Sequence, residues 1–276
     1  METVEARRSL RAAAGGMEFH YLEWGGPDAP AMVLLHGLTG HAHTWDHVAR
    51  ALADRYHLFA PDQRGHGDSA HAASYATTDF TRDLAALVKL WQLERFVLIG
   101  LSMGGHNAMA YAVEHPEQVS RLIVVDIGPR LRREQAPNRQ EMVTLARTGH
   151  RPFATFDEAF SAARAANTTA PDAMLRDRTR WNLRQTDAGL LLKYDAAAPA
   201  RWDPADLTDA LPRIGAPTLV VRGGKTQVLP PQVADEMVAA IPDAELVEVP
   251  DSGHSVPTDR PDDLARVVAE WLARRR

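Results

Sequence analysis

The chain has 276 residues, a net charge of −5 and no cysteine. This length suits one large domain with an insertion, and the lack of cysteine excludes disulfides, thiolate catalysis and cysteine-based metal sites. The small negative charge, without a long basic block, argues against a nucleic-acid partner. Neither a signal-peptide core nor a run of roughly 18 apolar residues occurs, so we expect a soluble, cytoplasmic protein that does not bind membranes.

Strand and helix patterns alternate through the first half of the chain. Residues 3–12 and 17–23 flank two glycines, which predicts an opening β-hairpin. The apolar run 31–35 is typical of a strand buried on both faces of a parallel sheet. A helix over 45–52, a strand over 56–60 and a helix capped by Asp79 are predicted next. Repeated β-α-β units predict a mainly parallel sheet with helices on both faces.

The segment Gly100-Leu101-Ser102-Met103-Gly104 lies between a strand pattern at 96–99 and a helical pattern at 106–115. A G-x-S-x-G segment in this position is typical of a nucleophile elbow. Its serine occupies a strained turn, so the residues two positions away must be small. The N-terminus of the following helix favours negative charge that develops at the serine. We predict Ser102 as a nucleophile; a glycine-rich turn that only binds an anion is the alternative.

The alternation stops after a buried-strand pattern at 121–125. Residues 129–210 show helical patterns and no convincing buried strand. Strand and helix patterns then resume at 217–221, 233–240, 245–249 and 261–274. We therefore predict a core made of residues 1–128 and 211–276, with residues 129–210 inserted as a helical cap.

A serine nucleophile needs a base that removes its proton. His254 follows the last predicted strand, in a loop that returns to the carboxyl edge of the sheet, and we predict it as the base. We interpret the other histidines as structural. The oxyanion hole needs two backbone N–H groups, which we assign to Leu38 and Met103. No H-E-x-x-H or phosphate-loop motif occurs, so no metal and no cofactor is predicted.

Five segments of the chain resemble the α/β-hydrolase superfamily in residues and in order. They are His36-Gly37, Asp62 to Ser69, Gly100 to Gly105, Val125 to Pro129 and Gly253-His254. Within that superfamily the chain is similar to a bacterial esterase branch with G-x-S-M-G-G and V-D-I-x-P motifs. The resemblance implies an α/β-hydrolase fold with a mostly parallel eight-stranded sheet, a helical lid and hydrolysis of esters or thioesters. A serine at position 102 argues against the branches that use a carboxylate nucleophile.

The acid partner of the base departs from the commonest pattern of this superfamily. Most relatives carry an acid after the strand predicted at 217–221, where this chain has Gln227. Glutamine has no charge to stabilise an imidazolium. Asp126 ends the strand after the nucleophile strand, and it is similar to the V-D-I-x-P aspartate that serves as acid in parts of the superfamily. We predict Asp126 as the acid, with an impaired enzyme or an aspartate that only caps the insertion as alternatives.

These residues together predict a serine hydrolase that acts through an acyl-enzyme on Ser102. The expected substrates are small to medium, largely apolar carboxylic esters or thioesters. Amide, lactone or carbon–carbon hydrolysis by the same triad, and a receptor-like binding protein, are the alternatives, and a homodimer is left open. The predicted substrate pocket consists of His36, Gly37, Trp181, Tyr194, Trp202 and Val228.

Overall fold

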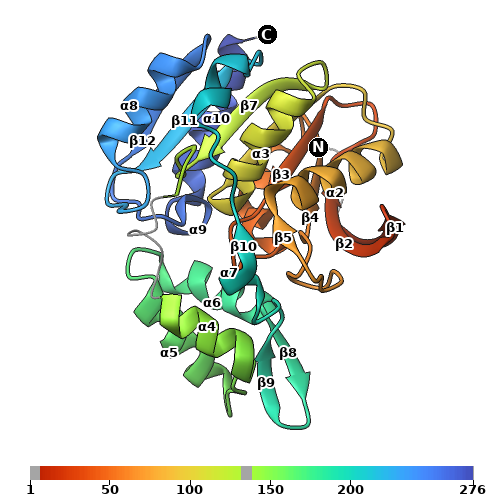
Figure 1. Ribbon diagram of the computed structural model, residues 1–276, viewed down its shortest axis with the longest axis vertical. Coiled ribbons are helices and arrows are strands. Elements are labelled where there is room, and N and C mark those ends of the chain that lie inside the picture. The colour runs from red at the N-terminus through yellow and green to blue at the C-terminus, as the bar shows by residue number, and fades with distance from the viewer. Residues whose placement is uncertain (1–6, 132–138, 276) are drawn as a thin grey trace.

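One eight-stranded sheet forms the centre of the molecule, in the order β1-β2-β4-β3-β6-β7-β11-β12 (Figure 1). The computed structural model describes residues 7–131 and 139–275. Strand β2 pairs antiparallel with β1 and β4, and the other neighbours are parallel. This confirms the predicted α/β-hydrolase fold and its opening hairpin. The strands are β1 (Arg8–Ala14), β2 (Met17–Trp24), β3 (Ala31–Leu35), β4 (His57–Pro61), β6 (Phe96–Leu101), β7 (Val119–Val125), β11 (Thr218–Gly223) and β12 (Ala244–Val249).

Helices cover both faces of this sheet, which explains why its strands read as continuous apolar runs. In β6, Val97 and Ile99 belong to one core cluster, while Phe96 and Leu98 belong to the other. The first cluster includes α1 (Asp46–Leu52) and α10 (Pro261–Arg274). The second includes α2 (Thr77–Leu90), α3 (Met103–Glu114) and α8 (Pro231–Ala240). Burial on both faces therefore fixes β6 and the residues that follow it.

A separate group of elements follows β7 in the sequence and precedes the 3-10 helix η3 (Thr208–Arg213). In Figure 1 this group lies beside the sheet. This group is not purely helical, because β8 and β9 form an antiparallel hairpin. Gly189 in its turn has a φ of 121° and lies against the Phe153 carbonyl, which only glycine allows. The elements are α4 (Arg139–Thr148), α5 (Phe156–Ala166), α6 (Asp172–Trp181), β8 (Leu183–Thr186), β9 (Gly189–Leu192) and α7 (Ala198–Arg201).

Short elements connect this group to the core. Strand β10 (Trp202–Asp203) pairs in parallel with β5 (Tyr75–Ala76), and α6 packs against η1 (Ala42–Trp45) and α9 (Val256–Asp259). Hydrogen bonds cross the same boundary from the His41 ring to the Arg178 carbonyl and from the Asn182 amide to the Thr39 carbonyl. Helix α6 is thereby held close to the loops at the carboxyl ends of the strands.

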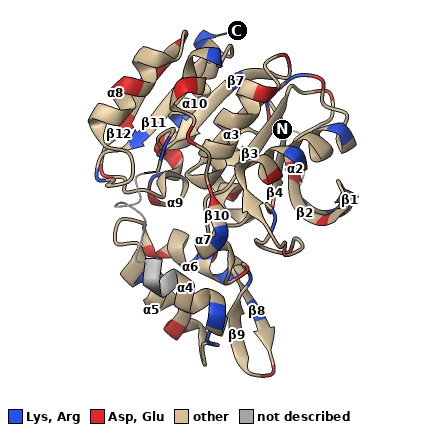
Figure 2. Cartoon of the chain, viewed as in Figure 1, with Lys and Arg blue, Asp and Glu red and all other residues tan. Residues whose placement is uncertain are grey.

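Two smaller features also follow from the sequence. Asp79 lies in the first turn of α2 rather than before it, and its carboxylate accepts the Ala76 N–H at 3.2 Å, so it caps the helix from within. Acidic and basic residues are interspersed over helices and loops (Figure 2). None of the described helices is long and apolar enough to cross a membrane.

Candidate active site

Ser102 lies in the sharp turn between β6 and α3, with φ 52° and ψ −122°. Such a backbone conformation costs a non-glycine residue about 1–3 kcal/mol, so the surroundings must hold it in place. The surroundings do so by close approach. A Cβ at Gly104 would lie 2.3 Å from the Leu35 carbonyl oxygen, and one at Gly100 would lie 2.2 Å from the Gly104 carbonyl oxygen. The small neighbours that the elbow motif predicts are therefore required here.

Ser102, His254 and Asp126 form one chain of hydrogen bonds. The Ser102 hydroxyl lies 2.9 Å from His254 Nε2, and His254 Nδ1 lies 2.7 Å from Asp126 Oδ2. Asp126 is fully buried, whereas the His254 side chain is about one-third exposed. The predicted nucleophile, base and acid thus meet, although 128 residues separate Asp126 from His254 in the sequence. This is the geometry that lets a histidine accept a serine proton while a carboxylate fixes its tautomer.

The Asp126 carboxylate is held by donors from the loop after β11. Its Oδ1 accepts the Gly223 N–H at 2.9 Å, and its Oδ2 accepts the Thr226 hydroxyl at 2.6 Å as well as the His254 N–H. Asp126 itself has a φ of 54°, and its N–H donates to the Val221 carbonyl. Gln227, which follows Thr226 in the sequence, is exposed and has no hydrogen bond within the described chain. The predicted acid is therefore oriented by the loop after β11, which also contains Gln227.

Thr226 is the residue that sequence reasoning missed. Its hydroxyl donates to Asp126 and accepts the Val228 N–H at 3.1 Å, so it is fixed at both ends. The available signal was position, because Thr226 directly precedes Gln227 in the loop expected to face the base. A buried carboxylate needs hydrogen-bond donors, and the Thr226 hydroxyl is a donor that the sequence of this loop contains.

The two predicted oxyanion residues border Ser102. A Cβ on Gly37, which precedes Leu38, would lie 3.2 Å from the Ser102 Cβ. Met103 begins α3, where the first N–H groups of a helix have no intrahelical acceptor. Within the described residues, no hydrogen bond engages the N–H of either Leu38 or Met103. The Met103 side chain is buried against Tyr75, while Leu38 lines the space beside Ser102.

A cavity of about 500 Å³ opens beside Ser102 and His254. Its wall is formed by the loop after β3 and by α5, α6, β9 and the loop after β12. Of the predicted pocket residues, Gly37 and Tyr194 line it. Small apolar side chains dominate the α5 side, where Ala159, Ala162, Ala163 and Ala166 lie.

The other four predicted pocket residues pack elsewhere. Trp181 stacks on His43 with ring centres 3.8 Å apart, and Trp202 packs beside Tyr75. His36 is fully buried, donating from Nδ1 to the Gly37 carbonyl and accepting the Gln63 N–H at Nε2. Val228 packs on the second core cluster. These side chains are packed against or bonded to neighbours, which the sequence pattern could not show, and none of them lines the described cavity.

The buried histidines have structural surroundings. Burial lowers the pKa of His36, His41 and His106, and it lowers that of His66 to about 3. Each of these rings bonds to a backbone group, as His106 does to the Ala205 carbonyl at 2.8 Å. They are therefore neutral at pH 7, and their bonds fix loops around the site.

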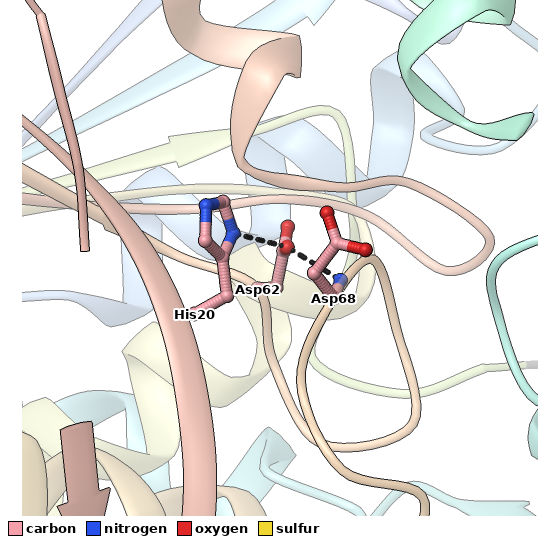
Figure 3. A group of neighbouring side chains, drawn as sticks. All are labelled: His20, Asp62 and Asp68. Carbon is pink, nitrogen blue, oxygen red and sulfur yellow. Dashed lines mark hydrogen bonds and ion pairs between the residues drawn. The ribbon is translucent and has the colours of Figure 1, made fainter. Parts of the chain in front are cut away.

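One cluster of His20, Asp62 and Asp68 has the composition of a metal site (Figure 3). Its ligand atoms are already engaged. Asp62 Oδ2 accepts His20 Nδ1 at 2.7 Å and the Asp68 N–H at 2.8 Å, and its Oδ1 accepts the Ala42 N–H. Burial opposes ionisation of Asp62, but the interactions with His20, His36 and the Asp68 N–H together outweigh it and hold the pKa of that carboxyl well below its usual range. These hydrogen bonds join β2, the loop after β4 and the start of η1.

The sequence profile of a family described as alpha/beta hydrolase fold matches residues 30–261. The chain belongs to the α/β-hydrolase family. An esterase of Mycobacterium tuberculosis is 31% identical to this α/β-hydrolase over 253 residues, or 90% of this chain and 84% of the other. Its solved structure superposes with a TM-score of 0.86 at 30% identity, covering 98% of this chain and 93% of that one. The family is one of hydrolases, and esterases are among the relatives of this chain.

Two further relatives have narrower names. The 2-(acetamidomethylene)succinate hydrolase of Mesorhizobium japonicum is 27% identical over 270 residues, or 96% of this chain and 95% of the other. A solved structure of E-2-(acetamidomethylene)succinate hydrolase superposes with a TM-score of 0.88 at 24% identity, covering 97% and 100% of the two chains, which shows a common fold. The N-formylmaleamate deformylase of Pseudomonas putida is 28% identical over 265 residues, or 94% of each chain.

Proposed function

We propose that this α/β-hydrolase is a serine hydrolase of small to medium carboxylic esters or thioesters. The observation that carries the proposal is the hydrogen-bonded chain from Ser102 through His254 to Asp126, at the wall of a cavity. A volume of about 500 Å³ is in the usual range for a small-molecule site. The esterase relative supports the same reaction class.

The reaction runs in two halves. His254 Nε2 takes the Ser102 proton as Oγ bonds to the substrate carbonyl carbon, and Asp126 stabilises the imidazolium that forms. The carbonyl electrons move onto oxygen, where the N–H groups of Leu38 and Met103 and the N-terminus of α3 stabilise the negative charge. The tetrahedral centre then collapses. The bond from the acyl carbon to the leaving oxygen, or to the sulfur of a thioester, breaks, and His254 gives that atom its proton.

Water completes the second half by the same route. His254 removes a proton from water, the hydroxide adds to the acyl carbon, and the bond to Ser102 Oγ breaks as His254 returns the proton to it. No cofactor enters these steps. The products are a carboxylic acid and an alcohol or thiol.

The geometry also bears on the binding-protein alternative. That alternative depended on Gln227 at the usual acid position, and Gln227 is exposed while a buried carboxylate bonds to His254. A complete acid–base chain favours an enzyme. Amide hydrolysis is the second candidate, because the names of two relatives contain an acetamido and an N-formyl group.

The proposal is tested by hydrolysis of p-nitrophenyl acetate and butyrate, with covalent modification of Ser102 as the direct readout. Exchange Ser102→Ala should abolish both turnover and modification. Turnover of these esters by the folded Ser102→Ala chain at the wild-type rate would contradict the proposal.

A further inference from the structure

Arg178 is a cation in the wall of the cavity that also contains Ser102 and His254. It lies on α6, and its side chain is partly exposed because the cavity borders it. Among the described residues of the wall, Arg178 is the one with a permanent charge, and none is an aspartate or glutamate. Its Nη1 lies 3.3 Å from the hydroxyl of Ser255, which also lines the cavity, so the positive charge lies at this wall.

No protein carboxylate within the described chain forms an ion pair with Arg178. Its one side-chain hydrogen bond there is from Nη1 to the Ser255 hydroxyl at 3.3 Å. A guanidinium has five N–H donors, so most of them have no acceptor among the described residues. Burial lowers the pKa of Arg178, and Asp259 is the acid whose charge opposes this effect.

Asp259 is not free to pair with Arg178. Its Oδ1 accepts the Asn167 side-chain N–H at 2.9 Å, and its Oδ2 accepts the Thr169 hydroxyl at 2.7 Å and the Gly253 N–H at 2.8 Å. Both oxygens are therefore held by the loop before His254 and by the segment between α5 and α6. The charge of Asp259 supports Arg178 from a distance and leaves its N–H groups open.

Two other inward-facing arginines of this chain show the contrast. Arg64 binds Asp83 with two N–H groups, at 2.6 and 2.8 Å. Arg222 binds the Leu229 carbonyl and Glu248. Removing a guanidinium from water is costly unless an anion replaces the water, and these two sites supply the anion from the protein. The Arg178 site does not, which is the arrangement of a site whose anion arrives with a ligand.

Other polar atoms of the same wall also lack partners. The Thr44 hydroxyl and Asn182 Oδ1 are buried, and neither has a hydrogen-bond partner within the described residues. The Tyr194 hydroxyl likewise has no hydrogen bond in the described chain. A cavity made only for apolar groups would not place such atoms in its wall. The cavity wall therefore offers polar atoms besides the Arg178 guanidinium.

We propose that Arg178 binds a carboxylate of the substrate, so that the preferred substrates carry a carboxylate on the part remote from the bond that is cleaved. This inference rests on the proposed function of Ser102. A planar guanidinium binds a carboxylate through two parallel hydrogen bonds, which would orient the substrate as well as attract it. The sequence alone led us to expect a largely apolar substrate. This proposal changes that expectation to a substrate with an anionic end.

The test compares charged and neutral versions of one ester. The mono-p-nitrophenyl esters of succinic, glutaric and adipic acid are assayed beside their methyl-capped diesters, with hydrolysis in the absence of protein subtracted. We expect the wild type to prefer the free carboxylate in at least one length, mainly through a lower KM. Exchange Arg178→Met should reduce kcat/KM for that substrate about 10- to 100-fold more than for its diester, the size of a lost hydrogen bond to a charged group. Arg178→Lys should retain part of the preference.

Arg180→Met is the matched control, because Arg180 lies on the same helix and is exposed. It removes the same charge and should leave the preference unchanged. A second readout needs no variant: glutarate or adipate should compete with the ester substrate, and the corresponding diamides should not. Equal rates for charged and capped esters at every length, or an equal loss for both in Arg178→Met, would overturn the inference while the ester hydrolase stands. Failure of the proposed function itself would appear as no turnover of the neutral esters and no modification of Ser102.

Discussion

Exchange of Asp126 for asparagine removes one charge and changes almost no volume. The two carboxylate oxygens face three donors, namely the Gly223 N–H, the Thr226 hydroxyl and the His254 N–H. If the side-chain amide nitrogen of the new asparagine faced Gly223, it would point an N–H at the Gly223 N–H in a buried site, at a cost of about 1–3 kcal/mol. The Thr226 hydroxyl can instead rotate to accept a proton. The amide nitrogen will therefore face Thr226 and His254.

This orientation gives His254 the wrong tautomer. With an N–H facing it, Nδ1 becomes the acceptor, so Nε2 carries the proton and cannot take the one on Ser102. The same exchange in a serine-protease triad lowers kcat about 10⁴-fold, which is about 5 kcal/mol of transition-state stabilisation. We expect a similar loss for Asp126→Asn, measured as kcat for p-nitrophenyl butyrate with a thermal melt to verify folding.

Gln227→Ala is the matched comparison for this exchange. Gln227 is exposed and has no hydrogen bond within the described chain, so its loss should change kcat less than about twofold. A kcat for Asp126→Asn within tenfold of the wild type would refute the assignment of the acid. So would a loss in Gln227→Ala as large as that in Asp126→Asn.

Two further predictions concern stability. Gly104→Ala should lower the free energy of unfolding, measured in urea, by about 1–3 kcal/mol, because the new Cβ would meet the Leu35 carbonyl. Gly26→Ala is the control, because the space around Gly26 is open, and it should not lower the free energy of unfolding. Equal effects of the two exchanges would contradict the close packing of the elbow. Stability should also fall on acidification from pH 6.5 toward 3, because the native pKa of His66 is about 3 and the unfolded chain takes up the proton first. The free energy of unfolding should fall by up to about 1.4 kcal/mol per pH unit. His66→Asn should reduce this dependence on pH. A wild-type free energy of unfolding that is constant over this window would exclude a buried, neutral His66.

The catalytic candidates could be predicted because each is tied to a local pattern at the end of a strand. The G-x-S-x-G segment marks Ser102, and the sheet brings the carboxyl ends of β6 and β7 side by side, which places Asp126 near it. The loop after β12 then returns His254 to the same edge. Parallel pairing of buried strands made these positions independent of side-chain detail.

The pocket could not be predicted in the same way, because its wall depends on which side of each inserted helix faces the core. Trp181 and Arg178 are three residues apart on α6, yet Trp181 stacks on His43 while Arg178 lines the cavity. The hairpin of β8 and β9 was missed because its strands are short and half-exposed, without the apolar run that marks a buried strand. Aromatic content alone therefore could not separate Tyr194, which lines the cavity, from Trp181 and Trp202, which pack elsewhere.

Covalent modification of Ser102 tests the central claim most directly. The folded wild-type chain, treated with a fluorophosphonate, should gain the mass of one adduct, and fragmentation should locate it on the peptide that contains Ser102. The same treatment should leave Ser102→Ala unmodified and should modify His254→Ala much more slowly, because the hydroxyl then has no base. Absence of an adduct on the folded wild type, or an equal adduct on Ser102→Ala, would contradict the account.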